Sequence, residues 1–128
     1  MKLIKINGVA YEVYDTKITR SFQVLDGENV GRLMNGKMER DVIGTYYNYT
    51  WELSPKDYEQ YDELYEILSS PVDSHIIEVP YGRNGRKTFE AYVTSGQDEL
   101  IHEENGDYYW EGLSIQFVAM DPARIPVE

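Results

Sequence analysis

Cysteine is absent from the 128 residues, which excludes disulfides, thiolate metal ligands and cysteine nucleophiles and fits a reducing compartment. No apolar run approaches about 18 residues, so we expect no membrane-spanning helix. The first residues carry two lysines but lack the apolar run and the cleavage site of a signal peptide. The length is that of a single domain, and we expect residues 1–128 to fold as one.

Basic residues are scarce: 12 Lys and Arg stand against 23 Asp and Glu, for a net charge of −11. This balance excludes a bare duplex-DNA binder, which needs a basic surface to neutralise phosphates. Residues 1–50 hold seven basic and six acidic residues, residues 51–80 one and eight, and residues 81–128 four and nine. Opposed patches of this kind would steer copies of one chain together, although an acidic surface also serves solubility alone.

Groups that carry chemistry are few. Two histidines are present, and His102 lies beside two glutamates that would not converge with it on one ion, so we expect no metal. No Gly-x-Ser-x-Gly elbow occurs. The glycine-rich basic stretch 82–87 lies between two expected strands, with no helix N-terminus to receive a phosphate. The sequence therefore predicts no catalytic residue and no cofactor, and hence no enzyme.

Four Asn-Gly dipeptides, at positions 7, 35, 84 and 105, are typical of type I′ hairpin turns. Between them, alternating apolar residues predict strands, and residues 95–107 read as a polar segment. We expect a mainly β (α+β) fold, an antiparallel β-sandwich or a partly closed barrel. The expected strands cover residues 3–6, 9–14, 16–24, 42–53, 74–80, 88–94 and 108–120.

One helix is predicted over about residues 55–69. Ser54 would cap it, Pro55 would take its first position, and an apolar stripe from Tyr58 to Leu68 would face a sheet. Residues 25–41 contain three glycines and few large apolar groups, so we expect a long loop or protruding hairpin there. Twelve tyrosines suit half-buried strands and interfaces.

Several long stretches, taken together over roughly residues 19–121, resemble small structural proteins encoded in phage and prophage morphogenesis regions of Gram-positive bacteria, those of the tail. The similarity is one of pattern and includes no short diagnostic motif. The stretches that carry it are Arg20–Gln23, Asp26–Asn29, Gly31–Arg32, Asp41–Tyr49, Tyr61–Leu64, Pro71–His75, Pro80–Gly82, Phe89–Gly96 and Tyr109–Ser114.

The resemblance implies a tail-tube-like subunit with two packed antiparallel sheets, one flanking helix and a long loop that reaches the next subunit. It implies a virion component made in the bacterial cytoplasm, a homo-oligomer when assembled, with copies of itself and adjacent tail proteins as partners. It offers no catalytic residues. Local basic excess in an acidic chain makes two groups interface candidates: first Arg32, Met34, Lys37, Met38 and Arg40, and second Arg83, Arg86 and Lys87.

Two alternatives remain from other classes. A carbohydrate- or surface-binding β-module would stack sugars on exposed tyrosine or tryptophan, with Trp51 or Trp110 as the platform. A small hydrolase would require a deep pocket with convergent polar groups.

Overall fold

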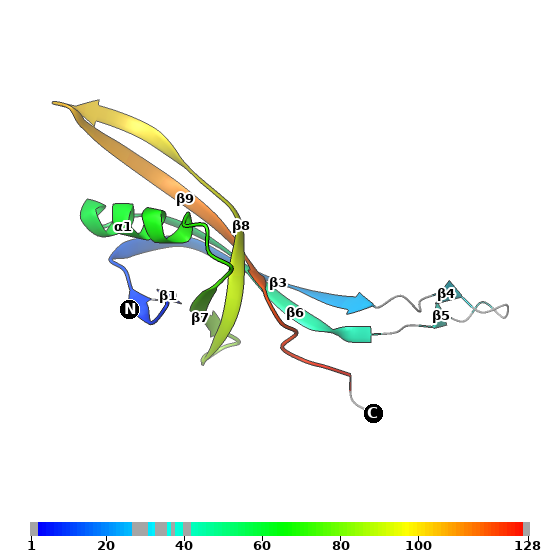
Figure 1. Ribbon diagram of the computed structural model, residues 1–128. Helices are drawn as coiled ribbons and strands as arrows, with labels where there is room; N and C mark the ends of the chain where they lie inside the picture. Colours follow the sequence, from blue (N-terminus) through cyan, green and yellow to red (C-terminus); the bar gives the residue numbers. More distant parts are fainter. Residues whose placement is uncertain (1–2, 27–30, 33–35, 37, 40–41, 127–128) are drawn as a thin grey trace.

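The computed structural model describes residues 3–26, 31–32, 36, 38–39 and 42–126, and it is mainly antiparallel β with one helix, as the sequence predicts (Figure 1). The short elements are β1 (Lys5–Ile6), β2 (Val9–Ala10), β4 (Gly31–Arg32) and β5 (Met38–Glu39). The long ones are β3 (Val13–Asp26), β6 (Val42–Pro55), α1 (Tyr58–Leu68), β7 (His75–Tyr81), β8 (Gly85–Glu104) and β9 (Asp107–Ala119).

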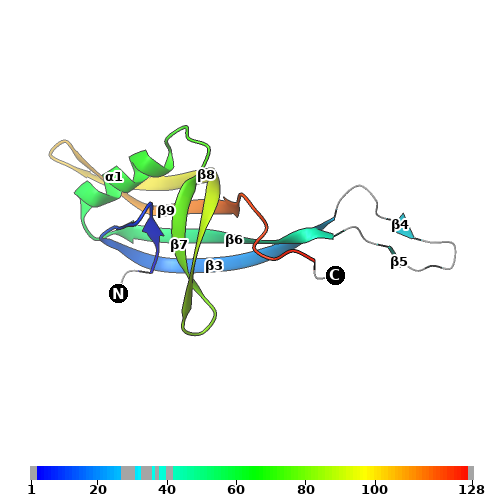
Figure 2. The ribbon, with the colours of Figure 1, turned by 60° about the horizontal axis from the view of Figure 1, so that its bottom comes forward.

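Seven strands form one antiparallel sheet in the order β2-β1-β7-β8-β9-β6-β3, and β4 pairs with β5 separately. The outermost strands, β2 and β3, do not pair with each other, so the sheet is open. In Figure 2, β7 and the nearby part of β8 cross β9, β6 and β3 steeply, which brings the two ends of the sheet into different orientations.

The two longest hairpins project from the sheet in different directions. β8 pairs with β7 only as far as Ala91, and its outer half then continues with β9 alone, forming an arm that extends past α1 (Figure 1). β3 and β6 pair along nearly their whole lengths and run away from the arm toward β4 and β5. We call residues 95–112, the outer parts of β8 and β9 with their turn, the β8–β9 arm.

The core lies between α1 and the sheet. Alternate residues of β6, among them Tyr49, Trp51 and Leu53, point inward and are almost fully buried, as the alternation predicts. They pack with the buried face of α1 and with residues from β1, β7 and β9. The other fully buried members are Ile6, Tyr61, Leu64, Ile77, Val79, Ala91, Leu113 and Phe117.

The helix begins later than expected. Ser54 and Pro55 are the last residues of β6, and the N-cap is Asp57, whose carboxylate accepts a hydrogen bond from the Glu59 N–H at 3.1 Å. The cap prediction failed because the strand keeps its pairing with β3 through Pro55, and a carboxylate two residues further on satisfies the helix donors equally well. The helix ends at Leu68 with Ser69 as its C-cap, close to the predicted position.

The turns show which Asn-Gly dipeptides act as expected. Asn7-Gly8 and Asn105-Gly106 both have positive φ at each residue and close two-residue turns. At the third site the prediction is wrong, because Gly82 takes the positive φ and Gly85 already pairs with Tyr81. The prediction of a polar segment over 95–107 is also wrong, because residues 95–104 continue β8.

Candidate interaction surfaces

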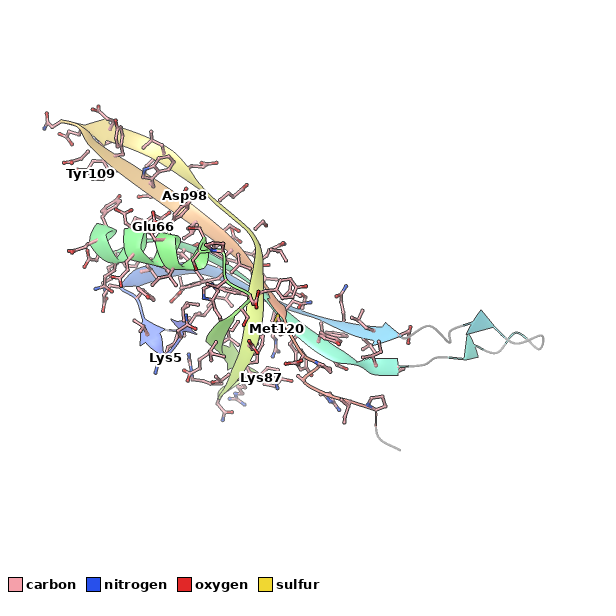
Figure 3. All side chains as sticks on the ribbon, viewed as in Figure 1. Lys5, Glu66, Lys87, Asp98, Tyr109 and Met120 are labelled. Atoms are coloured by element: carbon pink, nitrogen blue, oxygen red, sulfur yellow. The ribbon has the colours of Figure 1, made fainter. Side chains whose placement is uncertain are left out.

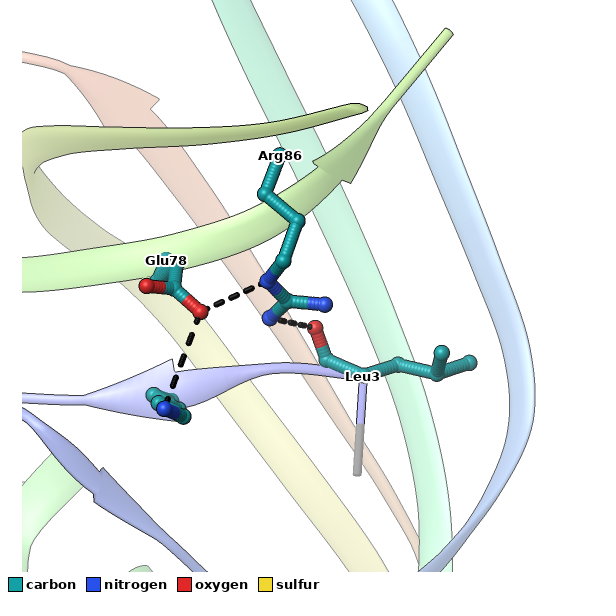
Figure 4. A network of polar contacts seen from close by, with 4 residues as sticks. Leu3, Glu78 and Arg86 are labelled. Carbon is teal, nitrogen blue, oxygen red and sulfur yellow. Dashed lines mark hydrogen bonds and ion pairs between the residues drawn. The ribbon is translucent and has the colours of Figure 1, made fainter. Parts of the chain in front are cut away.

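The three basic residues of the β7–β8 hairpin have three different environments. Arg86 is part of the fold: its Nε donates to Glu78 Oε2 at 2.6 Å, and its Nη2 donates to the carbonyl of Leu3 (Figure 4). The Lys5 ammonium lies 4.0 Å from the same glutamate oxygen, so this contact ties β1, β7 and β8 together. Arg83, at the turn itself, is exposed and has no partner among the described residues.

Lys87 belongs to a cluster of cations and tyrosines. Its ammonium lies 5.2 Å from the ring centroid of Tyr47 and 4.9 Å from that of Tyr81. The Arg20 guanidinium lies 5.4 Å from the Tyr81 ring, and the two tyrosine rings meet edge to face at 5.5 Å. The hydrogen bond between the phenols lowers the pKa of Tyr47, which Arg124 lowers further, and raises the pKa of Tyr81. The cluster presents positive charge beside aromatic rings.

Two residues of the first group of interface candidates lie on the paired strands β4 and β5. Arg32 is on β4 and is paired with Met38 of β5, which brings the backbones of these two candidates together. The other three candidates, Met34, Lys37 and Arg40, lie outside the described residues. Within the described part, the antiparallel β4–β5 ladder agrees with the hairpin form of the expectation for residues 25–41.

Sequence reasoning predicted the strand over 108–120 and named Trp110, but it missed the outer half of β8, which pairs with that strand to form the β8–β9 arm. Leu100 and Trp110 face each other across the two strands, and both are more than a third exposed. Ile101 and Tyr108 near the tip are more than half exposed. The signals were present in the Asn105-Gly106 turn and the apolar pair at 100–101, but the two acids on each side of that pair masked the strand pattern.

Two contacts hold the arm against α1. The Tyr61 hydroxyl donates to Asp98 Oδ2 at 2.9 Å, and the rings of Tyr58 and Tyr109 meet edge to face at 5.2 Å. Burial and the carboxylate of Asp98 raise the pKa of Tyr61, so this phenol stays protonated as a donor. Between helix and arm lies a hollow of about 170 Å³, lined by Tyr61, Asp62, Tyr65, Asp98 and Trp110.

A cavity of about 220 Å³ opens at the C-terminal end of α1, between the helix and strands β8 and β9. His75 lies in its wall and is 5% exposed, and burial lowers the pKa of its imidazole. Its Nδ1 is 3.3 Å from the side-chain amide nitrogen of Asn7, whose oxygen accepts from the Ile76 N–H at 2.9 Å. The Ser70 hydroxyl donates to the Ile67 carbonyl. The imidazole and this hydroxyl are thus engaged in local structure.

The two tryptophans differ sharply. Trp51 is 1% exposed, and its indole N–H donates to Asp15 Oδ1 at 2.7 Å, so it cannot act as a sugar platform and that expectation is wrong for this residue. Trp110 is 38% exposed on the β8–β9 arm. No three His, Asp or Glu side chains gather as metal ligands anywhere in the described part of the chain. Within that same part, no helix is long and apolar enough to span a membrane.

Comparison with protein-family models gives no match, and no curated protein sequence matches the chain significantly.

Proposed function

We propose that this chain is a non-enzymatic structural component of a phage or prophage tail that acts by self-assembly or by contact with adjacent tail proteins. The observation that carries the proposal is the pair of extended hairpins, the β8–β9 arm and the β3–β6 hairpin, projecting from one small core in different directions (Figure 1). Projections of this kind gain little burial within their own subunit. They would gain it by covering a neighbour.

The sheet edges support the same proposal. β3 is 14 residues long, lies at the edge of the open sheet and is exposed over most of its length. Phe22 is 68% exposed there. A long exposed edge strand offers a row of unpaired backbone groups to another chain, and monomeric proteins usually cover or shorten such strands. In a ring or tube, neighbouring copies would cover these edges.

The proposal includes a two-layer arrangement close to the expected sandwich or partly closed barrel. The steep crossing of β7 and β8 over β9, β6 and β3 in Figure 2 supports it, and α1 would flank these layers. The partners are copies of this chain and neighbouring tail proteins, and the assembled protein would belong to a virion made in the bacterial cytoplasm.

Light scattering over a range of protein concentrations, followed by electron microscopy of the largest species, tests the proposal. We expect rings or tubes whose mass grows with concentration. Reversing the charges of Arg32, Lys37 and Arg40 together to glutamate should weaken assembly, because these residues give the stretch 32–40 three cations against one acid in an acidic chain. A wild-type chain that is strictly monomeric at all concentrations would contradict self-assembly.

The carbohydrate-binding alternative is favoured by one observation, the exposure of Trp110 beside Tyr108 on the β8–β9 arm. Because Trp51 is buried, a glycan that stacks on the arm should change the fluorescence of Trp110 alone. A Trp110→Phe variant should therefore lose the entire glycan-induced change. If the change survives in that variant, the arm is not the platform.

A further inference from the structure

The β8–β9 arm has apolar and aromatic side chains that the described chain leaves partly uncovered. Leu100, Ile101, Tyr108 and Trp110 are 47%, 55%, 61% and 38% exposed. Neither strand of the arm has a third strand beside it: β8 leaves β7 after Ala91, and β9 pairs with β6 only between Leu113 and Phe117. An isolated two-stranded hairpin is only marginally stable in water, and its exposed apolar face is typical of a surface that binds a partner.

The charge of the arm specifies what kind of partner fits. Residues 98–111 contain six acids, and no Lys or Arg occurs between positions 88 and 123. A partner must therefore bring cations, and it must place them against tyrosine and tryptophan rings. Arginine satisfies both demands, because its guanidinium binds carboxylates and stacks on aromatic faces.

This chain carries such a group at a distance from the arm. Arg83 is exposed at the β7–β8 turn without a partner among the described residues, close to the cation cluster of Lys87. β8 runs from the turn to the arm, and in Figure 3 Lys87, near its beginning, lies well apart from Asp98 and Tyr109. The turn and the arm of one molecule therefore cannot contact each other, whereas those of two molecules can.

We propose that the β8–β9 arm of one copy binds the β7–β8 turn of a second copy, with the Arg83 guanidinium among the arm's carboxylates and against the ring of Trp110 or Tyr108. This inference rests on the proposed self-assembly and names its contact. The two surfaces differ, so the contact is head-to-tail and repeats into a ring or filament. It is also distinct from any contact made by residues 25–41.

Charge reversal with a matched control tests the contact. The variant Glu99→Lys/Glu103→Lys/Glu104→Lys changes only exposed arm residues. The control, Glu59→Lys/Glu63→Lys/Glu66→Lys, makes the same change of net charge on exposed positions of α1. We expect the arm variant to weaken self-association about tenfold or more, and the control to leave it within about twofold of wild type. Adding Arg83→Glu to the arm variant should restore association in part.

Disulfide cross-linking tests whether the arm and the turn of two copies lie close together. The chain has no cysteine of its own, so only the introduced cysteines can pair. Single-cysteine variants Ile101→Cys and Asn84→Cys, mixed and oxidised, should form a disulfide heterodimer, and both positions are exposed. The pair Ile101→Cys and Val72→Cys serves as the control. Val72 is 55% exposed, but it precedes β7, whereas the turn follows that strand.

The outcomes separate the two proposals. If wild type assembles and the arm variant assembles equally well, the arm–turn contact is wrong while self-assembly stands. If the helix variant dissociates as readily as the arm variant, the effect is one of net charge and the contact is again overturned. A monomeric wild type that gives no cross-link between positions 101 and 84 contradicts both proposals.

Discussion

Replacing Gly44 by alanine should detach the C-terminal segment from β6. The segment forms an antiparallel bridge with the strand at this point: the Thr45 N–H donates to the carbonyl of Arg124 at 2.8 Å, and the Ala123 N–H donates to the carbonyl of Thr45 at 2.8 Å. A Cβ on residue 44 would lie 2.5 Å from the Arg124 carbonyl oxygen and 2.7 Å from Cβ of Pro122. A backbone oxygen cannot rotate away, so the segment must move.

The size of the effect follows from what the segment contributes. Two backbone hydrogen bonds of about 0.5–1.5 kcal/mol each are lost, so the free energy of unfolding should fall by about 1–3 kcal/mol. The segment's last described residues are exposed, and Ile125 is 71% exposed, so little core burial is lost with them. Release of the segment returns conformational entropy, which places the expected loss at the lower end of that range.

Amide hydrogen exchange by NMR measures the detachment residue by residue. In Gly44→Ala, the amides of Thr45 and Ala123 should lose protection while that of Trp51 in the core keeps it. The matched control is the same substitution in a chain that ends at Asp121, where the obstacle is gone. There alanine should be neutral or slightly stabilising, since it restricts the unfolded chain more than glycine does. Wild-type protection at Ala123 in the full-length variant would refute the reasoning.

Three further predictions concern single buried contacts. Asp15→Ala should lower the free energy of unfolding by about 1–3 kcal/mol in urea titrations, because the buried Trp51 indole N–H loses its acceptor, while Asp15→Asn should retain most of the stability. Burial lowers the pKa of His75 below its value in the unfolded chain, so its contribution to stability is present above a pH of about 6.5 and is lost as the pH falls. The variant His75→Gln should therefore flatten the pH dependence of the free energy of unfolding between pH 7.5 and 5.5. An unchanged slope in that variant would contradict this. Tyr61→Phe removes the hydrogen bond to Asp98 and should speed amide exchange in the β8–β9 arm without unfolding the core; equal exchange rates would show that the bond does not hold the arm.

The parts of the fold that sequence could predict are those set by local chemistry or by burial on one side. Alternation in β6 predicts its buried face because Trp51 and Leu53 line the core on every second residue. Asn7-Gly8 predicts its turn because both residues tolerate positive φ. The helix follows from its apolar stripe, and its start is misplaced by a few residues because Asp57 caps as well as Ser54 would.

The outer half of β8 could not be predicted in this way, because it has no core behind it. A strand that is exposed on both faces has no reason to alternate, and residues 95–104 therefore have the composition of a loop. Their strand conformation comes from pairing with β9, whose residues are close in sequence but whose register includes three irregularities. The local signals of the arm in this stretch are the turn at Asn105-Gly106 and the apolar pair at 100–101.

The same limit explains why the sequence could not show which arginine of the basic turn is bound within the fold and which is exposed. Arg83 and Arg86 are three positions apart and chemically identical, but Arg86 is bound by a carbonyl 83 residues away in the chain and by Glu78 across the hairpin. A long-range partner of this kind leaves no trace in the spacing of the residues. What remains after such partners are assigned is a shorter set of cations with no partner in the part of the chain that the structure describes, and Arg83 belongs to it.

β3 is protected against edge-to-edge pairing with another chain along only part of its length, and this affects how the sheet avoids aggregation before assembly. Near its start the strand carries an irregular register between Asp15 and Lys17, followed by the cation of Arg20, and both a bulge and positive charge discourage edge-to-edge pairing. Further along, Phe22 and Val24 are exposed in the stretch before the strand's second irregularity, which lies between Leu25 and Asp26. In the proposed assembly, a neighbour that covers this second stretch would bury the most apolar surface. The first stretch can stay exposed to water, because its irregularity and its cation discourage pairing.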